Sequence, residues 1–309
     1  MTDHVQGLHH VTAIAGSAAG NLHFYRDALG LRFVKKTVNF DDPGTYHLYY
    51  GDEVGSAGTI MTFFPLEGIR QGAAGAGQVT LTQFAVPDGS LDFWRARLPG
   101  FGAVLVRDET LFDEARAIFT DPDGRAFALV DRADARSPWR VSGVGSEVAI
   151  RGFAGVTLSV RDGSSTAAVL TEVFGYAAEG EDGATCRFRA RSGAADVVDL
   201  HVDATIPLGR EGSGSVHHAA FSVPDRAAQR AMKARMEAAG LRVTEQIDRD
   251  YFWAIYSRVP EGILFEVATD EPGFAVDEPV DELGTGLRLP KQHEPLRERI
   301  EAVLPALES

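Results

Sequence analysis

The feature that most constrains the fold is an internal repeat, in which a strand, a helix and further strands recur four times along the 309 residues. The second and fourth copies match most closely. "FAVPD" (84–88) resembles "FSVPD" (221–225) at the end of a first strand, and "DPDGRAFALV" (121–130) resembles "VPEGILFEVA" (259–268) at a closing hairpin. Pro-Asp-Gly and Pro-Glu-Gly both suit tight turns. Repetition on this scale predicts stacked or paired copies of one small module.

Each copy has the pattern of a βαβββ module. In the first copy, residues 20–30 carry apolar side chains at helical spacing, and Gly30 stands where a helix commonly ends. Alternating apolar residues over 32–40, 45–52 and 58–65 then predict three strands. The sequence therefore predicts an α+β fold of four βαβββ modules that form two half-open barrel domains.

Composition and linkers divide the chain into four parts. We expect an N-terminal domain with the first two modules at residues 1–131 and a linker at 132–150. A C-terminal domain with the other two modules should cover 151–273. The remaining segment, 274–309, should dock on the outside, because its apolar residues are spaced as in one amphipathic helix.

Charge and composition exclude several classes of partner. The formal net charge of −14 would repel nucleic acid and anionic membranes. No window approaches the roughly 18 to 20 apolar residues that span a bilayer. The single cysteine, Cys186, cannot form an internal disulfide. We therefore expect a cytoplasmic protein with no nucleic-acid or membrane partner, and a homo-oligomer stays open.

Two histidine pairs mark equivalent first strands. "GLHHVT" contains His9–His10, and "SVHHAA" contains His217–His218. The matching position is Leu81 in the second copy and Gly155 in the third. Because the same strand forms without histidine in those two copies, the histidines are not a requirement of the strand.

One carboxylate accompanies the histidines. Glu266 lies in the apolar "ILFEVA", where the second copy has Ala128. Burying an unpaired carboxylate is costly, so a cation is its simplest partner. One histidine of each pair together with Glu266 would form the two-histidine, one-carboxylate triad typical of non-haem Fe(II). That site requires modules one and four to be neighbours, so modules two and three should also pair.

The order of these motifs resembles a known family. "GLHHVT", "YHLYYGDEVGSAGTIMTFFP", "VHHAAFSVPD", "YFWAIYSRVPEGILFEV" and "LRLPKQHEPLRERIEAVLP" together resemble the vicinal oxygen chelate superfamily, and more specifically its hydroquinone ring-cleaving dioxygenases. The resemblance implies that His10, His218 and Glu266 bind Fe(II), with Mn(II) as the other candidate. It leaves the role of His9 open, with a structural hydrogen bond as one reading.

The resemblance also implies which residues surround the metal. Thr12, His217, Arg249 and Tyr256 match the family's residues next to the metal. Tyr256 and His217 would be candidates for proton transfer, and Arg249 for stabilising anionic oxygen. The implied partners are a small aromatic diol and O2, both atoms of which would enter the product when a ring carbon–carbon bond opens.

Three other functions stay open. A glyoxalase-like isomerase or lyase typically has a fourth protein ligand, and Thr62 stands at that position here. A catechol extradiol dioxygenase uses the same triad, but its ligands usually come from the second half, where Gly155 occupies the third module's position. A metal-free protein that binds aromatic compounds would have no use for the triad.

Several residues have equally simple structural explanations. Arg249 could form a surface ion pair with Asp248 or Asp250, and Tyr256 could be a core aromatic residue. Phe252 and Trp253 could supply the apolar wall that an aromatic substrate needs. Four further histidines are expected to be surface or packing residues: His23, His47, His201 and His293.

Overall fold

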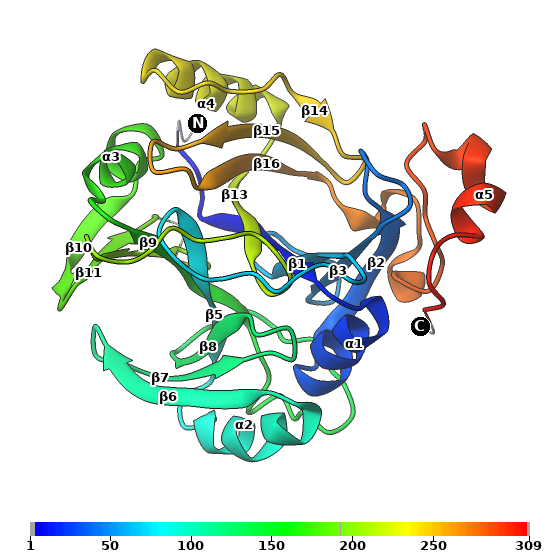
Figure 1. Cartoon of the computed structure of the whole chain (residues 1–309), viewed down its shortest axis with the longest axis horizontal. Helices are drawn as coiled ribbons and strands as arrows, with labels where there is room; N and C mark the ends of the chain where they lie inside the picture. The colour runs from blue at the N-terminus through cyan, green and yellow to red at the C-terminus, as the bar shows by residue number, and fades with distance from the viewer. Residues whose placement is uncertain (1–3, 192, 308–309) are drawn as a thin grey trace.

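The strands form two curled sheets of eight strands each (Figure 1). This computed structural model describes residues 4–191 and 193–307. The first sheet comprises, in spatial order, β14 (Ile247–Asp248), β15 (Phe252–Arg258), β16 (Leu264–Pro272), β13 (Val216–Val223), β1 (Leu8–Ala15), β4 (Ile60–Pro65), β3 (Tyr46–Gly51) and β2 (Arg32–Val38). The second comprises β10 (Ala177–Asp182), β11 (Thr185–Arg189), β12 (Val197–Val202), β9 (Gly152–Val160), β5 (Gln78–Val86), β8 (Ala126–Asp131), β7 (Glu114–Thr120) and β6 (Val104–Leu111).

The order of strands in each sheet confirms the predicted pairing of modules. The first sheet joins module one to module four through the antiparallel pair β1–β13, and the second joins module two to module three through β5–β9. Within each module the first and last strands lie side by side and parallel, as β1–β4 and β13–β16 do. Each sheet therefore combines one module from residues 1–131 with one from 151–273.

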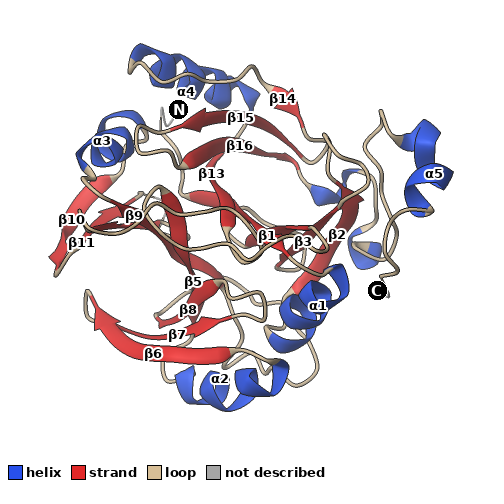
Figure 2. Cartoon of the chain, viewed as in Figure 1, coloured by secondary structure: helices blue, strands red, loops and turns tan. Residues whose placement is uncertain are grey.

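One helix per module covers the outside of the sheets (Figure 2). The helices are α1 (Ala18–Leu22, continued by a π-helical turn at His23–Ala28), α2 (Leu91–Arg97, continued by a 3-10 turn at Leu98–Phe101), α3 (Ser164–Ala168, continued by a π-helical turn at Val169–Val173) and α4 (Arg226–Ala238). Side chains cap two of them: Ser17 accepts from the Gly20 N–H at 3.3 Å and Asp225 from the Ala228 N–H at 2.8 Å. Among the described residues, no helix is long and apolar enough to cross a membrane.

Protein charges balance one another in the interior of the second sheet. Gly155 takes the place of a histidine there, and a Cβ at this position would lie 2.4 Å from the Val197 carbonyl oxygen. Beside it, the buried Asp199 carboxylate accepts two hydrogen bonds from the Arg187 guanidinium, at 2.7 and 2.9 Å, and one from Gln83 at 3.0 Å. A guanidinium therefore neutralises the carboxylate in this half-barrel.

The C-terminal segment packs on the outer side of the first sheet (Figure 1). Three 3-10 turns (Phe274–Val276, Val280–Glu282 and Glu294–Leu296) lead to α5 (Arg297–Glu301). Ile300 is buried against Val38 of β2, and the His293 ring donates a hydrogen bond to the Phe40 carbonyl at 2.9 Å. The expected single amphipathic helix is shorter than its pattern, because Pro295 limits helical hydrogen bonding at its start and Pro305 lies just beyond its end.

Candidate metal centre

Two β-bulges turn the histidine pairs toward the inside of the first sheet. On β1, His10 and Thr12 face inward, while Val11 and Ala13 pack into the core. The pairing of β1 with β13 skips one residue in each strand, His9 in β1 and His217 in β13. A bulge re-aims a side chain. Both members of each pair can therefore lie near the same point, which regular alternation would not allow.

His10, His218 and Glu266 converge on one point. Their closest atoms form a triangle: His10 Nε2 to His218 Nε2 is 3.2 Å, His10 Nε2 to Glu266 Oε2 is 3.4 Å, and His218 Nε2 to Glu266 Oε2 is 3.0 Å. All three residues are buried. Metal–nitrogen bonds of about 2.0–2.1 Å place neighbouring ligand atoms about 3 Å apart, so these spacings suit one metal ion.

His9 and His217 orient the two histidines at the centre. His9 Nδ1 lies 2.9 Å from His10 Nδ1, and His217 Nδ1 lies 2.7 Å from His218 Nδ1. Burial lowers the pKa of His9 to about 3, and burial with the neighbouring His218 lowers the pKa of His217 to about 4. Both outer rings are therefore neutral, and the Nδ1 of each can accept a hydrogen bond from the Nδ1–H of the inner ring. That tautomer leaves the Nε2 lone pairs of His10 and His218 directed at the centre.

The Glu266 carboxylate has the surroundings of a metal ligand. Neither of its oxygens accepts a well-oriented hydrogen bond from a described residue, although the carboxylate is buried. Its pKa lies well below the usual range because the attraction of His10 and His218 outweighs the burial that opposes ionisation. Two lone pairs and a carboxylate that face one another need a cation between them. The donor set fits a divalent transition metal such as Fe(II) or Mn(II).

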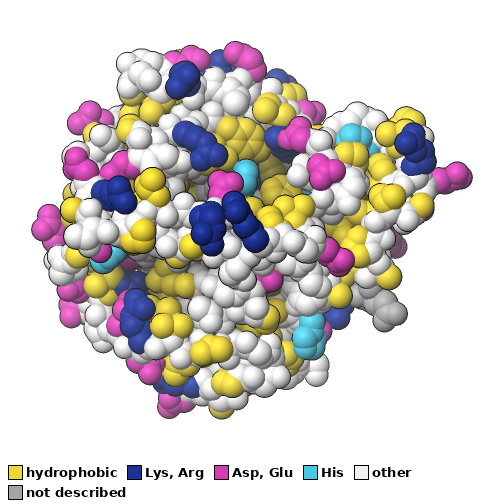
Figure 3. All heavy atoms as spheres, in the orientation of Figure 1, with side chains coloured by type: hydrophobic (Ala, Val, Ile, Leu, Met, Phe, Trp, Pro, Cys, Tyr) yellow, Lys and Arg dark blue, Asp and Glu magenta, His cyan; other side chains and the backbone are white. Residues whose placement is uncertain are grey.

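The centre opens into a pocket of about 380 Å³. In the space-filling view, a hollow with hydrophobic side chains and a histidine lies over this half-barrel (Figure 3). The apolar wall consists of Ile14, Phe40, Phe64, Leu66, Phe252 and Leu264. The prediction for Phe252 is confirmed, whereas the prediction for Trp253 is wrong. Trp253 follows Phe252 on the strand, so it faces the other side and packs under the Arg226 guanidinium, 3.6 Å from the ring centre.

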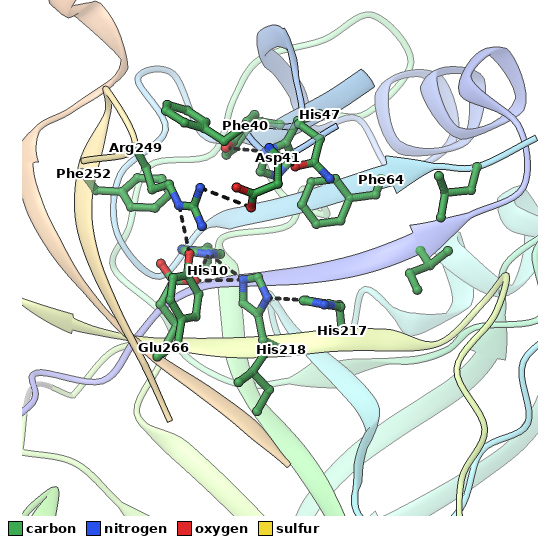
Figure 4. Close-up of a pocket in the computed structure, with 16 residues that line it drawn as sticks. His10, Phe40, Asp41, His47, Phe64, His217, His218, Arg249, Phe252 and Glu266 are labelled. Atoms are coloured by element: carbon green, nitrogen blue, oxygen red, sulfur yellow. Dashed lines mark hydrogen bonds and ion pairs between the residues drawn. The ribbon is translucent and has the colours of Figure 1, made fainter. Parts of the chain in front are cut away.

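Arg249 and Tyr256 both line the pocket, and Figure 4 shows Arg249 beside Asp41. Arg249 Nε donates to the Tyr256 hydroxyl at 3.3 Å, and its Nη1 lies 3.6 Å from Asp41 Oδ2. The expected ion pair with Asp248 or Asp250 is therefore wrong; the partner comes from module one. Burial and the charge of Glu266 raise the pKa of Tyr256, so its hydroxyl stays protonated.

A hydrogen-bonded chain runs along module one. Thr12 is fully buried behind the pocket, and its Oγ1 lies 3.2 Å from Thr62 Oγ1. Thr62 Oγ1 is also 2.6 Å from His47 Nε2, and His47 Nδ1 is 2.8 Å from the Tyr49 hydroxyl. His47 packs between Tyr49 and Phe64, in keeping with the packing role expected for it, and it also lines the pocket, which was not expected. His47 and Tyr49 are two residues apart, so both lie on the same face of a strand. That spacing is the signal in the sequence from which the position of His47 could have been inferred.

The remaining histidines have other surroundings. His23 is exposed and pairs with Asp27 at 3.0 Å, and His293 serves the docked tail. His201 borders the interior of the second half-barrel. Those three positions agree with the surface or packing roles expected for them.

Comparison with known proteins identifies the family. Residues 7–129 and 152–276 match the Glyoxalase/Bleomycin resistance protein/Dioxygenase superfamily. "Putative ring-cleaving dioxygenase MhqE" of Bacillus subtilis (strain 168) is 44% identical over 303 residues, which are 98% of this chain and 99% of that protein. "Chlorohydroquinone/hydroquinone 1,2-dioxygenase" of Sphingobium indicum is 34% identical over 312 residues, 97% of this chain and 96% of that protein.

Solved structures show the same architecture. The crystal structure of a "putative dioxygenase from Bacillus subtilis subsp. subtilis str. 168" superposes on this structure with a TM-score of 0.96 at 42% sequence identity. The match covers 99% of this chain and 98% of that chain. Glyoxalase I from Zea mays has a TM-score of 0.64 at 15% sequence identity. The match covers 85% of this chain and 92% of that chain, and at this identity it shows a shared fold alone. The two curled sheets match the two-domain vicinal oxygen chelate fold, as the sequence predicts. The chain belongs to the glyoxalase/bleomycin resistance protein/dioxygenase superfamily.

Proposed function

We propose that this protein is an Fe(II)-dependent ring-cleaving dioxygenase that acts on hydroquinone-type aromatic diols. The observation that carries the proposal is the buried triad of His10, His218 and Glu266 at an apolar pocket, with Thr62 where a fourth carboxylate ligand would stand. A metal held by three ligands on one side keeps positions free for a substrate oxygen and for O2. The names of the relatives support ring cleavage and a hydroquinone substrate.

The chemistry divides between the metal and the chain. When bound, Fe(II) would supply the redox chemistry that O2 requires and a Lewis acid for the ionised substrate hydroxyl. The chain would hold the aromatic ring between Phe64 and Phe252 and limit the access of water. Because the wall is mainly apolar, a neutral substituted ring suits it better than a highly charged one.

Three polar residues would handle protons and developing charge. The Tyr256 hydroxyl receives a hydrogen bond from Arg249 and keeps its own proton to donate into the pocket. The Arg249 guanidinium places positive charge beside oxygen atoms that become anionic. His217 lines the pocket, and because its Nδ1 faces His218 it would present its Nε2–H as a hydrogen-bond donor to a substrate oxygen. The roles of Tyr256 and Arg249 agree with those that the family resemblance implies.

Reconstitution with metal tests the proposal. The protein should be loaded with Fe(II) without oxygen, and oxygen uptake should be followed with hydroquinone, chlorohydroquinone, methylhydroquinone and catechol. We expect one Fe(II) per chain and uptake with the para-diols. A protein that binds neither Fe(II) nor Mn(II), or that consumes no oxygen with any para-diol, would contradict the proposal.

A matched pair of variants separates the triad from general effects on charge. Glu266→Gln should lower metal occupancy at least tenfold, since it removes the only anionic ligand. Glu271→Gln changes an exposed glutamate on the same strand and should leave metal binding unchanged. Equal metal binding by both variants would contradict the assignment of Glu266 as a metal ligand.

A further inference from the structure

The first sheet has an internal two-fold relation that equates residues of modules one and four. Its strand order reads the same from either end, with β1 and β13 at the centre. On the module-four side, Tyr256 of β15 pairs with Glu266 of β16. On the module-one side, Tyr49 of β3 pairs with Thr62 of β4. Tyr49 is therefore the counterpart of Tyr256, just as Thr62 is the counterpart of Glu266.

The two tyrosines have different supporting residues. Tyr256 is held by Arg249, whereas Tyr49 is held by His47, which lies two residues earlier on the same strand. The His47 ring is fixed between the rings of Tyr49 and Phe64, with centroid distances of 4.1 and 4.3 Å. Because threonine is shorter than glutamate, His47 Nε2 can reach Thr62 at 2.6 Å. This packing fixes the orientation of the His47 ring in the wall of the pocket.

Hydrogen-bond capacity distinguishes Tyr49 from its neighbours. Both ring nitrogens of His47 are engaged, with Thr62 and Tyr49. A hydroxyl offers one donor and two acceptor sites, and the Tyr49 hydroxyl has only His47 as a hydrogen-bond partner among the described residues. Tyr49 lines the pocket, so its unused capacity is available to a ligand there.

The position of this group suits one feature of a para-diol. In Figure 4, His47 lies across the pocket from Glu266, and the Tyr49 hydroxyl is 2.8 Å from His47 Nδ1. A para-diol that bound the metal through one oxygen would carry its second hydroxyl on the opposite edge of the ring. An ortho-diol would place both oxygens at the metal. Only the apolar C–H edge of its ring would then face the His47 side of the pocket.

We propose that the Tyr49 hydroxyl, positioned by His47, hydrogen-bonds the substrate hydroxyl remote from the metal and selects para-diols over ortho-diols. This inference rests on the proposed function. Asp41 on the same side is less suited, because its side chain is 83% exposed and pairs with Arg249. A site built to bond a substrate hydroxyl discriminates against compounds that lack it.

Binding to the Fe(II)-loaded protein without oxygen tests the inference, because turnover cannot occur. Dissociation constants should be measured for hydroquinone and for phenol, which lacks the second hydroxyl. Tyr49→Phe should weaken hydroquinone binding by about 3- to 10-fold, the effect of one hydrogen bond, and leave phenol binding unchanged. His47→Asn should act in the same direction. Tyr50→Phe is the control, because Tyr50 faces the core and bonds Asn21.

The outcomes separate this inference from the proposed function. If the wild type takes up oxygen with para-diols but Tyr49→Phe weakens both ligands equally or neither, the role of Tyr49 is wrong and the function stands. If the wild type shows no uptake with any para-diol, the proposed function itself fails. Each variant should still unfold in one cooperative transition well above the assay temperature, which confirms that binding is measured on folded protein.

Discussion

Thr62 occupies in module one the sheet position that Glu266 occupies in module four. Thr62 pairs with Thr12 of the neighbouring parallel strand, and Glu266 pairs with Ala220 in the same way. A carboxylate on one side and a hydroxyl on the other make the centre asymmetric. Among the described residues, the candidate triad of His10, His218 and Glu266 therefore has no fourth acidic residue at this position.

Thr62→Glu should convert the centre toward four protein ligands. We expect tighter metal binding and a fall in oxygen uptake of at least about 100-fold, because the new carboxylate takes a position that substrate or O2 needs. Metal titration and an oxygen electrode measure the two effects.

Thr62→Ser is the matched control for that change. It keeps the hydroxyl next to His47 and should retain most of the activity. The added bulk of Glu should cost about 1–3 kcal/mol of stability, which thermal unfolding would report. Full oxygen uptake by a metal-loaded Thr62→Glu variant would contradict the assignment of this position.

Arg249→Lys should lower kcat at least about tenfold without changing the metal content. Lysine offers a single compact charge, so it cannot bond the Tyr256 hydroxyl and reach Asp41 at the same time. Asp41→Asn should change activity less than about threefold, because an exposed ion pair contributes at most about 1 kcal/mol. Steady-state kinetics on metal-matched samples would distinguish the two. Equal losses in both variants would show that the ion pair, and not the guanidinium, matters.

Asp199→Asn should destabilise the protein without reducing the activity of the folded fraction. It removes one of the two negative partners of the buried Arg187, which keeps only Glu114, and breaking a buried ion pair typically costs up to about 3–5 kcal/mol. Urea unfolding measures the loss. Asp108→Asn, in an exposed pair with Arg95, should cost less than about 1 kcal/mol. Similar stabilities for the two variants would contradict a structural role for the second half-barrel's charges.

His293→Ala should raise KM for the diol about 2- to 5-fold while kcat and metal content stay unchanged. The lost hydrogen bond holds the Phe40 carbonyl, and Phe40 lines the pocket. Kinetics at saturating O2 provide the test. His23→Ala changes an exposed histidine far along the chain from this contact and should have no effect. An unchanged KM would mean that the tail does not support the pocket.

The module order, the pairing of modules and the triad were predictable from the sequence. Each copy of the repeat shows what the shared strand requires, so a residue that departs from the other copies, such as Glu266, stands out against them. The bulges at His9 and His217 were not predictable, because a pattern of alternating residues does not show where one residue is skipped.

The missed contacts join residues on different strands. His47 has its partner Thr62 fifteen residues away on the next strand of module one, and Arg249 of module four has its partner Asp41 in module one. The first contact depends on the register of β3 with β4 and the second on how two modules meet, and neither leaves a local pattern in the sequence. Trp253 shows the reverse case, because its face of the strand followed from alternation once Phe252 was placed inside.

Because each sheet combines one module from each half of the chain, the two sheets are completed at different points of synthesis. The second sheet can close once residue 202 has been made, whereas β1 must wait for β13, which ends at residue 223. Until then one edge of β1 has no partner strand, and open edges promote association with other chains. A ribosome-bound chain therefore carries an unfinished first sheet beside a finished second one. Pauses in translation between residues 202 and 223 would prolong the exposure of the open edge of β1.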